Sequence, residues 1–304
     1  MGISWSGVFP AVTTQFTEDQ SVDLEATARH VEVLLESGVS GLVMLGSLGE
    51  NVSLKPEEKR RLMASTIRQV RGRVPVLSGV AETTTAGAVG YVMDMEKLGA
   101  DGVMVMPAMV YKSDPREALE HFRAIARITC LPILVYNNPV SYGVDITPGM
   151  FAELADKKNL VAIKESSADV RRITDLINEV GERYAIFTGV DDLALESAML
   201  GAKGWIAGLV NAFPAENQHL WELAVAGKWE EAKKIYRWYM PLLHLDTHPK
   251  FVQYIKLAVQ ECGLGRETVR APRLPLSGAE REAVLKVIHE GIRNRPTVPV
   301  RGAR

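Results

Sequence analysis

A repeated unit occupies most of the chain, in which a short apolar run is followed by polar residues and then by a helical pattern. About eight such units fill the first 226 residues. The apolar runs are residues 7–16, 41–45, 74–80, 102–106, 132–136, 160–164, 184–188 and 204–207. They are almost continuously apolar, which is typical of parallel strands covered on both faces. The repeat therefore predicts an α/β protein with a (β/α)8 TIM barrel fold.

The alternative for such a repeat is a doubly wound open sheet. No Gly-x-Gly-x-x-Gly sequence follows the first apolar run, and the number of units matches a barrel. Beyond residue 227 the strand pattern ends, and three helices are expected at 228–245, 249–262 and 277–293. We therefore predict a barrel of residues 1–226 and a C-terminal three-helix extension of residues 227–304. Residues 295–304 contain two prolines and a glycine and are expected to form a loose tail.

Composition and charge restrict the class of protein. The chain has 304 residues, of which 47% are hydrophobic, and its formal net charge is -2. No block rich in Lys and Arg is present, which argues against nucleic acid or an anionic membrane as a partner. No apolar run approaches the ~18 residues of a membrane helix, and the first ten residues do not resemble a signal peptide. Cys130 and Cys262 lie in apolar or helix-like contexts, so we expect no disulfide and a cytoplasmic location.

One apolar run, 160–164, ends in Lys164 and is followed at once by polar residues. An isolated ammonium is unfavourable in the interior, so such a lysine needs a carboxylate partner, solvent or a chemical role. If burial lowers its pKa, the free amine can attack a carbonyl carbon and form a Schiff base. From this run alone, a structural lysine that reaches solvent or pairs with a neighbour remains the alternative.

In a barrel of this kind, the residues that follow each strand gather at one end and line the catalytic mouth. These positions include Lys164, Tyr136 and Ser47. The amine can act as nucleophile, the phenol as proton carrier and the serine as an orienting or relay group. Taken singly, Tyr136 could be an amphipathic cap on the core, and Ser47 part of a simple glycine turn. Their convergence on one predicted face favours the catalytic interpretation.

Further residues at the same end are predicted to contact the substrate. Glycines flank Ser47 and Leu48, so this turn can expose backbone N–H groups to a substrate carboxylate. Asn138 begins a polar loop whose shape would set specificity. Gly189 and Ile206 lie at the ends of the seventh and eighth apolar runs.

His244 and His248 invite a metal interpretation, because histidines four residues apart can share a helix face. Pro249 follows immediately, no glutamate occupies the metalloprotease position and no third ligand is apparent. The sequence also holds no phosphate-binding loop and no serine-hydrolase elbow. We therefore predict no metal and no cofactor.

Several motifs resemble the dihydrodipicolinate synthase / N-acetylneuraminate lyase superfamily. They are GSLGE at 46–50, YNNP at 136–139, VAIKESS at 161–167, GVDD at 189–192, GAKGWIAGLVN at 201–211 and KLAVQECGLG at 256–265. The resemblance covers almost the whole chain and implies that Lys164 forms a Schiff base with a 2-oxo acid, with Tyr136 as general acid/base. It further implies that the turn of Ser47 and Leu48 binds the carboxylate and that the backbone of Ile206 contacts the substrate. A homotetramer built as a dimer of dimers is also implied.

Three positions depart from the synthase pattern of that superfamily. Ser141 stands where synthases place an arginine for the second substrate's carboxylate, and Leu48 replaces a threonine. Synthases borrow a relay tyrosine from a neighbouring subunit, and Met109 occupies the matching position here, with Tyr111 as the nearest phenol. These departures argue against a role in lysine biosynthesis.

The sequences GSLGEN, VYNNP, FTGVDD and LLHLDTHPKFVQYIK resemble more closely the Δ1-pyrroline-4-hydroxy-2-carboxylate deaminases of hydroxyproline breakdown. This resemblance implies conversion of a cyclic imine to 2,5-dioxopentanoate and ammonia. The nearest alternative is a dehydratase or aldolase for 2-keto-3-deoxy sugar acids, with the same lysine and tyrosine. Another alternative is a catalytically silent barrel that binds a 2-oxo acid, against which the presence of both Lys164 and Tyr136 argues.

Overall fold

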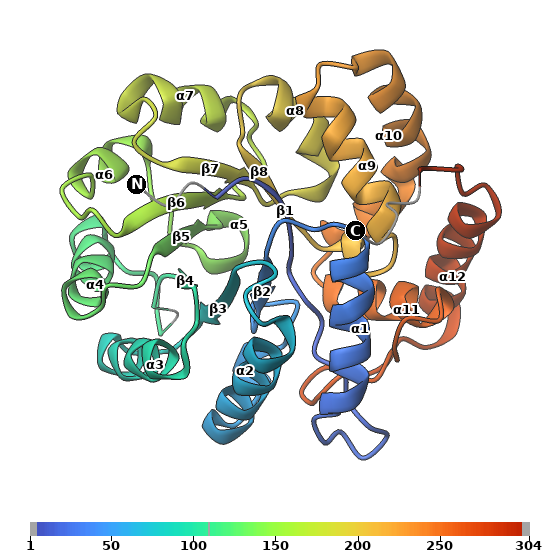
Figure 1. Ribbon diagram of the computed structural model, residues 1–304, viewed down its shortest axis with the longest axis horizontal. Coiled ribbons are helices and arrows are strands. Elements are labelled where there is room, and N and C mark those ends of the chain that lie inside the picture. The colour runs from blue at the N-terminus through green and yellow to red at the C-terminus, as the bar shows by residue number, and fades with distance from the viewer. Residues whose placement is uncertain (1–4, 109, 300–304) are drawn as a thin grey trace.

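Eight parallel strands form one sheet in a computed structural model that describes residues 5–108 and 110–299. The strands are β1 (Gly7–Pro10), β2 (Leu42–Met44), β3 (Val76–Val80), β4 (Gly102–Val105), β5 (Ile133–Asn137), β6 (Leu160–Glu165), β7 (Ala185–Thr188) and β8 (Gly204–Ala207). Their order is β1-β8-β7-β6-β5-β4-β3-β2. The edges meet just past β1, where Ala11 bridges to Val43 and the Val12 N–H donates to the Val43 oxygen at 2.9 Å. The predicted (β/α)8 barrel with C-terminal helices is therefore confirmed (Figure 1).

Helices surround the barrel (Figure 1). Several of them begin at a capping side chain. Asp23 accepts the Ala26 N–H, and Asp114 with Glu117 forms a capping box. The surrounding helices are α1 (Leu24–Glu36), α2 (Pro56–Val70), α3 (Thr85–Leu98), α4 (Pro115–Ile128), α6 (Pro148–Glu153), α7 (Arg171–Val180), α8 (Ala194–Met199) and α9 (Pro214–Val225). Short 3-10 turns occur at η1 (Asn51–Ser53), η2 (Asp191–Leu193) and η3 (Leu209–Asn211).

Large and small side chains alternate inside the barrel. Phe9 of β1 and Phe187 of β7 pack edge to face, with ring centroids 5.2 Å apart. A Cβ on Gly204 would lie 2.2 Å from the Phe187 ring, and one on Gly41 would lie 2.4 Å from the Phe9 ring. The two phenyl rings therefore fill space that only glycine leaves open, which gives the dense packing expected of a barrel core.

Two local expectations differ from the structure. β1 ends at Pro10 and not at residue 16, because the next backbone groups bond elsewhere: the Thr13 N–H donates to Asn211 Oδ1 at 3.1 Å. Thr14 Oγ1 donates to the Gly49 oxygen at 2.7 Å, so this hydroxyl holds a turn in place. The polar loop expected after β5 contains a one-turn helix, α5 (Pro139–Tyr142), which matters for the site.

The C-terminal part consists of α10 (Trp229–Leu243), the 3-10 turn η4 (His244–Asp246), α11 (Phe251–Glu261) and α12 (Gly278–Arg293). These elements lie on one side of the barrel, beyond α9 and α1 (Figure 1). The first predicted helix tightens into η4 at its end and does not continue to residue 245 as an α-helix. The division at residues 226 and 227 stays a prediction. Residues 295–299 of the predicted loose tail form no helix or strand, and residues 300–304 lie outside the described residues.

None of the helices within residues 5–108 and 110–299 is both long and apolar enough to cross a membrane.

Candidate active site

Lys164 and Tyr136 are direct neighbours inside the barrel. They are register partners on the paired strands β6 and β5, which places their side chains on the same side of the sheet. Lys164 Nζ lies 4.1 Å from the centre of the Tyr136 ring, and each residue is 6% exposed. Strand pairing therefore brings the predicted nucleophile and the predicted proton carrier together.

The surroundings of the Lys164 amine favour its neutral form. Burial lowers the pKa of Lys164, and the negative charges of Asp246, Tyr142 and Asp191 oppose this shift only in part. No residue of the described ranges forms an ion pair or a hydrogen bond with Nζ. The amine is thus buried without the carboxylate partner that would hold it as an ammonium, which is the state a nucleophilic lysine requires.

Gly189, at the end of β7, leaves the space that the Lys164 side chain occupies. A Cβ at this position would lie 2.3 Å from Lys164 Cε and 2.1 Å from Ser166 Oγ. Ser166 is itself buried. The role predicted for Gly189, contact with substrate, stays a prediction, and the structure gives this glycine a second role in positioning the lysine.

We expect Gly189→Ala to slow Schiff-base formation by about 10²-fold, because a displacement of about 1 Å at a reacting group has an effect of this order. The measurement is the rate of borohydride trapping with pyruvate, alongside the thermal unfolding midpoint. Gly149→Ala is the matched control, since a Cβ there meets no atom within 4 Å. Wild-type trapping rates for Gly189→Ala would show that the lysine does not depend on this space.

Ser47 and Leu48 lie in a tight turn directly after β2. Leu45 and Glu50 on either side have φ values of +57°, a left-handed conformation that such residues rarely adopt. The N–H groups of Ser47 and Leu48 form no hydrogen bond with any residue that the structure describes. The Leu48 side chain is buried in the core, so only its backbone is available for the carboxylate contact predicted from the sequence.

Tyr142 extends the site beyond the residues found from the sequence, and it lies in the same short helix that Asn138 caps. The substrate contact predicted for Asn138 stays a prediction. Asn138 caps α5 by accepting the Ser141 N–H at 2.9 Å, and its Nδ2 donates to the Tyr136 hydroxyl at 3.1 Å. Tyr142, at the end of α5, forms a short hydrogen bond between its hydroxyl and Ser47 Oγ. Its ring meets the Tyr136 ring edge to face, with centroids 5.5 Å apart. One short helix therefore links Ser47 with Tyr136.

Two carboxylates, those of Asp191 and Asp246, interact electrostatically with Lys164. Asp191 is fully buried and accepts the N–H groups of Gly208 and Leu209 at 3.0 and 2.8 Å. Burial raises the pKa of Asp191 to about 6. Burial and the nearby Asp191 raise the pKa of Asp246 well above its usual range, while Lys164 lowers it. Asp246 comes from η4 in the C-terminal part and packs against Gly208, where a Cβ would lie 2.5 Å from its Oδ1.

Ile206 lies within β8, paired in register with Phe9 of β1, and is 1% exposed. Its side chain belongs to the barrel core, so a contact with substrate could involve only its backbone. That contact stays a prediction.

Sequence reasoning missed Tyr142 and the placement of Asp246. The Asn138-Pro139 pair and Gly143 are start and stop signals of a short helix, and they could have placed Tyr142 on one. Asp246 lies between His244 and His248 in the sequence. No local signal places it beside the lysine, because the approach depends on how the C-terminal part packs.

The two histidines of the rejected metal site serve other contacts. His244 Nδ1 lies 2.8 Å from Asp192 Oδ2, and His248 stacks on Tyr254 with centroids 4.6 Å apart. In residues 5–108 and 110–299, no group of three or more His, Cys, Asp or Glu side chains has the arrangement of a metal site.

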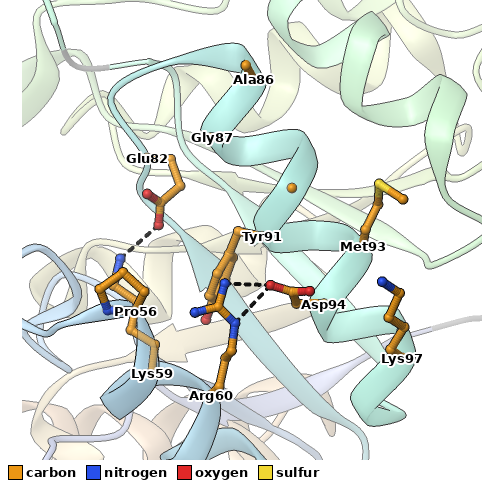
Figure 2. A pocket seen from close by; sticks show the side chains of 11 residues that line it. Pro56, Lys59, Arg60, Glu82, Ala86, Gly87, Tyr91, Met93, Asp94 and Lys97 are labelled. Atoms are coloured by element: carbon orange, nitrogen blue, oxygen red, sulfur yellow. Dashed lines mark hydrogen bonds and ion pairs between the residues drawn. The ribbon is translucent and has the colours of Figure 1, made fainter.

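A pocket of about 400 Å³ lies between α2 and α3, away from the residues around Lys164. Figure 2 shows two pairs of oppositely charged side chains that face one another in this pocket. Lys59 Nζ pairs with Glu82 at 2.7 Å, and Arg60 Nη2 pairs with Asp94 at 2.6 Å. Two of the three basic side chains that line this pocket are thus paired with carboxylates, Lys97 being the third, and Lys164 does not line the pocket.

Comparison with known proteins places these features in a family. The model of the dihydrodipicolinate synthetase family matches residues 4–291. A 4-hydroxy-tetrahydrodipicolinate synthase of Exiguobacterium sibiricum is 35% identical over 275 residues, covering 90% of this chain and 92% of the relative. The corresponding protein of Methanospirillum hungatei is 32% identical over 271 residues, covering 88% and 93%.

Solved structures give the same result. The 4-hydroxy-tetrahydrodipicolinate synthase of Methylacidiphilum fumariolicum superposes with a TM-score of 0.91 at 30% identity, covering 95% of this chain and 97% of that chain. YagE of Escherichia coli, a prophage protein of the dihydrodipicolinic acid synthase family in complex with pyruvate, superposes with a TM-score of 0.89 at 27% identity, covering 95% and 99%.

Proposed function

The chain belongs to the dihydrodipicolinate synthetase family, and on this basis we propose that it is a Schiff-base-forming lyase for small 2-oxo or imino acids. The observation that carries the proposal is the Lys164 amine, which is buried against the Tyr136 ring and has no ion-pair partner among the residues that the structure describes. A neutral amine at the mouth of a barrel can attack an electrophilic carbon, and the adjacent phenol can move the protons that imine formation requires. The turn of Ser47 and Leu48 would hold the substrate carboxylate with its unpaired N–H groups.

Within this chemistry the proposed substrate is Δ1-pyrroline-4-hydroxy-2-carboxylate. Lys164 would attack C2, and transimination would open the ring and free a primary amine on C5. Tyr136 would then carry a proton from C3 to the C4 hydroxyl, and the C4–O bond breaks to release water as the C3–C4 double bond forms. Movement of the double bond toward C5 gives a second imine, and hydrolysis of both imines releases ammonia and 2,5-dioxopentanoate. One water is consumed overall, and Lys164 is regenerated.

The charge pattern of the mouth supports this substrate over the pair used by a synthase. Ser141 is exposed on α5, at the position where the synthase pattern has an arginine for a second carboxylate. Asp246 instead contributes an acidic group on the Lys164 side of the mouth. The raised pKa of Asp246 favours its protonated form, and the ammonium on C5 of the opened ring would lower that pKa and pair with the ionised form, whereas a second carboxylate would not.

The test compares three substrate sets with the same enzyme preparation: the pyrroline, a 2-keto-3-deoxy sugar acid, and pyruvate with aspartate semialdehyde. We expect ammonia and 2,5-dioxopentanoate in equal amounts from the pyrroline, at a rate well above those of the other two reactions. Ammonia is measured by a coupled assay and the dicarbonyl product by mass spectrometry. Pyruvate release or dehydration of the sugar acid, without ammonia from the pyrroline, would contradict the proposed substrate and favour the sugar-acid enzyme.

A further inference from the structure

Tyr142 is positioned between the two hydroxyl groups that the proposed mechanism uses. Its hydroxyl is hydrogen-bonded to Ser47 Oγ, and its ring packs at 89° against the Tyr136 ring. Tyr136 is buried, whereas Tyr142 and Ser47 are partly exposed. The three side chains therefore form a line of hydroxyl groups that leads from the buried lysine toward solvent.

Short-range contacts hold Tyr142 in this place. The Tyr142 N–H donates to the Asn138 oxygen at 2.9 Å, and the following Gly143 N–H donates to the Pro139 oxygen at 3.0 Å. Gly143 has a φ of +71°, which ends the turn and lets the chain leave the site. The Asn138 side chain caps the same turn and also donates to the Tyr136 hydroxyl. The orientation of Tyr142 is thus coupled to that of Tyr136.

The pKa shifts of Tyr136 and Tyr142 indicate which of the two hydroxyl groups donates to the other. Burial raises the pKa of Tyr136, and hydrogen bonds that include those from Asn138 and Tyr142 oppose the rise. Burial raises the pKa of Tyr142 well above its usual range, and negative charge on Tyr136 raises it further. A negative charge on the Tyr136 oxygen therefore disfavours ionisation of Tyr142, which leaves the Tyr142 hydroxyl protonated and able to donate.

We propose that Tyr142, together with Ser47, completes a proton relay to Tyr136 within a single chain. The proposal rests on the proposed Schiff-base function and adds a positioning residue and a proton path to it. All members of the relay come from one chain, so the relay needs no residue from a second copy. Tyr111, another phenol near the mouth loops, is 60% exposed and donates to Glu117 Oε1 at 2.6 Å, which leaves it outside this path.

Protons move along the relay when the carbinolamine, the adduct of Lys164 and the substrate carbonyl, loses its hydroxyl group. The Tyr136 O–H gives its proton to the leaving hydroxyl, the C–O bond breaks, and the C=N bond to Lys164 forms. The Tyr142 O–H reprotonates the Tyr136 oxygen, and the Ser47 O–H reprotonates the Tyr142 oxygen. Ser47 recovers its proton from water at the open end. One solvent proton enters and one water leaves, so no hydroxyl group changes its net charge.

The first test is Tyr142→Phe, which keeps the ring and removes only the hydroxyl. Exchange of the pyruvate methyl protons with D₂O, followed by NMR, should slow by about 10²-fold, because loss of a proton carrier has an effect of this order or larger. The solvent isotope effect on this step should change, which loss of packing alone would not cause. Ser47→Ala should slow exchange similarly, and the double variant should be no slower than the worse single variant. Tyr184→Phe, at the far end of β7, is the matched control and should exchange at the wild-type rate.

The second test asks which chain Tyr142 serves. Lys164→Ala and Tyr142→Phe chains are mixed, unfolded and refolded together, and exchange is measured. We expect no recovery of exchange in the mixture, since no chain holds both groups. Recovery toward a wild-type site would overturn the single-chain relay, as would a wild-type rate for Tyr142→Phe alone. Failure of the wild-type protein itself to exchange or trap pyruvate would instead contradict the proposed function.

Discussion

Replacing Lys164 with alanine is expected to lower turnover by on the order of 10⁴-fold or more, because the substitution removes the only atom proposed to bond covalently to the substrate. The groups that bind the carboxylate and carry protons stay in place, so the Michaelis constant should change far less than the turnover number. Steady-state kinetics with the pyrroline substrate measures both quantities. The thermal unfolding midpoint checks that the variant is folded.

Two control variants show whether activity depends on the nucleophilic amine of Lys164. One keeps a basic side chain at this position, and the other removes a different lysine. Lys164→Arg keeps a long basic side chain but has no nucleophilic amine, and it should be as inactive as Lys164→Ala. Lys203→Ala removes an exposed lysine at the opposite end of the barrel, just before β8, and should keep full activity. Turnover of folded Lys164→Ala within tenfold of the wild type would rule out the covalent mechanism.

Breaking the buried ion pair between Lys256 and Glu50 is expected to lower the free energy of unfolding by about 3–5 kcal/mol, as for other buried pairs that lose one partner. Lys256 Nζ lies 2.9 Å from Glu50 Oε1, and both side chains are 0% exposed. Lys256→Met would leave the Glu50 carboxylate in the interior with the Arg270 N–H at 2.9 Å and the more distant Arg273 guanidinium as partners. Urea-induced unfolding measures the change.

The same pair fixes the geometry of the substrate turn. Glu50 ends the turn that carries Ser47 and Leu48, and Lys256 reaches it from α11 while also donating to the Thr14 oxygen at 2.9 Å. We therefore expect weaker substrate binding in addition to lower stability. The double variant Lys256→Met/Glu50→Gln should lose less than the sum of the two single variants, since the removed groups interact directly.

The control for this prediction is the ion pair of Lys250 and Glu280, which also lies in the C-terminal part but at the surface. Lys250→Met should leave the unfolding midpoint almost unchanged, because exposed pairs contribute little. Equal effects of Lys250→Met and Lys256→Met would contradict the role assigned to the buried pair.

The barrel could be predicted from the sequence because its strands are short, continuously apolar and separated by helices with clear start signals. The prediction was wrong where hydrogen bonds to distant residues decide the structure. β1 stops at Pro10 because the Thr13 N–H bonds to Asn211, which lies 198 residues away. No sequence pattern around Thr13 can indicate a hydrogen-bond partner so far away along the chain.

The residues of the candidate site could likewise be predicted from the sequence only in part. Lys164, Tyr136 and Ser47 could be proposed because barrel geometry brings the ends of the strands to one mouth. Tyr142 was missed because residues 138–145 have a polar, loop-like composition, although Asn138, Pro139 and Gly143 carry the signals of a one-turn helix. Asp246 and Lys256 were missed because their contacts depend on how the C-terminal helices pack on the barrel.

The formation of an imine at Lys164 is the central claim, and trapping it in the unmodified protein tests it most directly. The protein is incubated with pyruvate and sodium borohydride, digested and mapped by mass spectrometry. We predict a single adduct on the peptide that contains Lys164, heavier by one pyruvic acid molecule less one oxygen atom, and no adduct without pyruvate. An unmodified Lys164 in folded protein, or an adduct on a different lysine, would contradict the account.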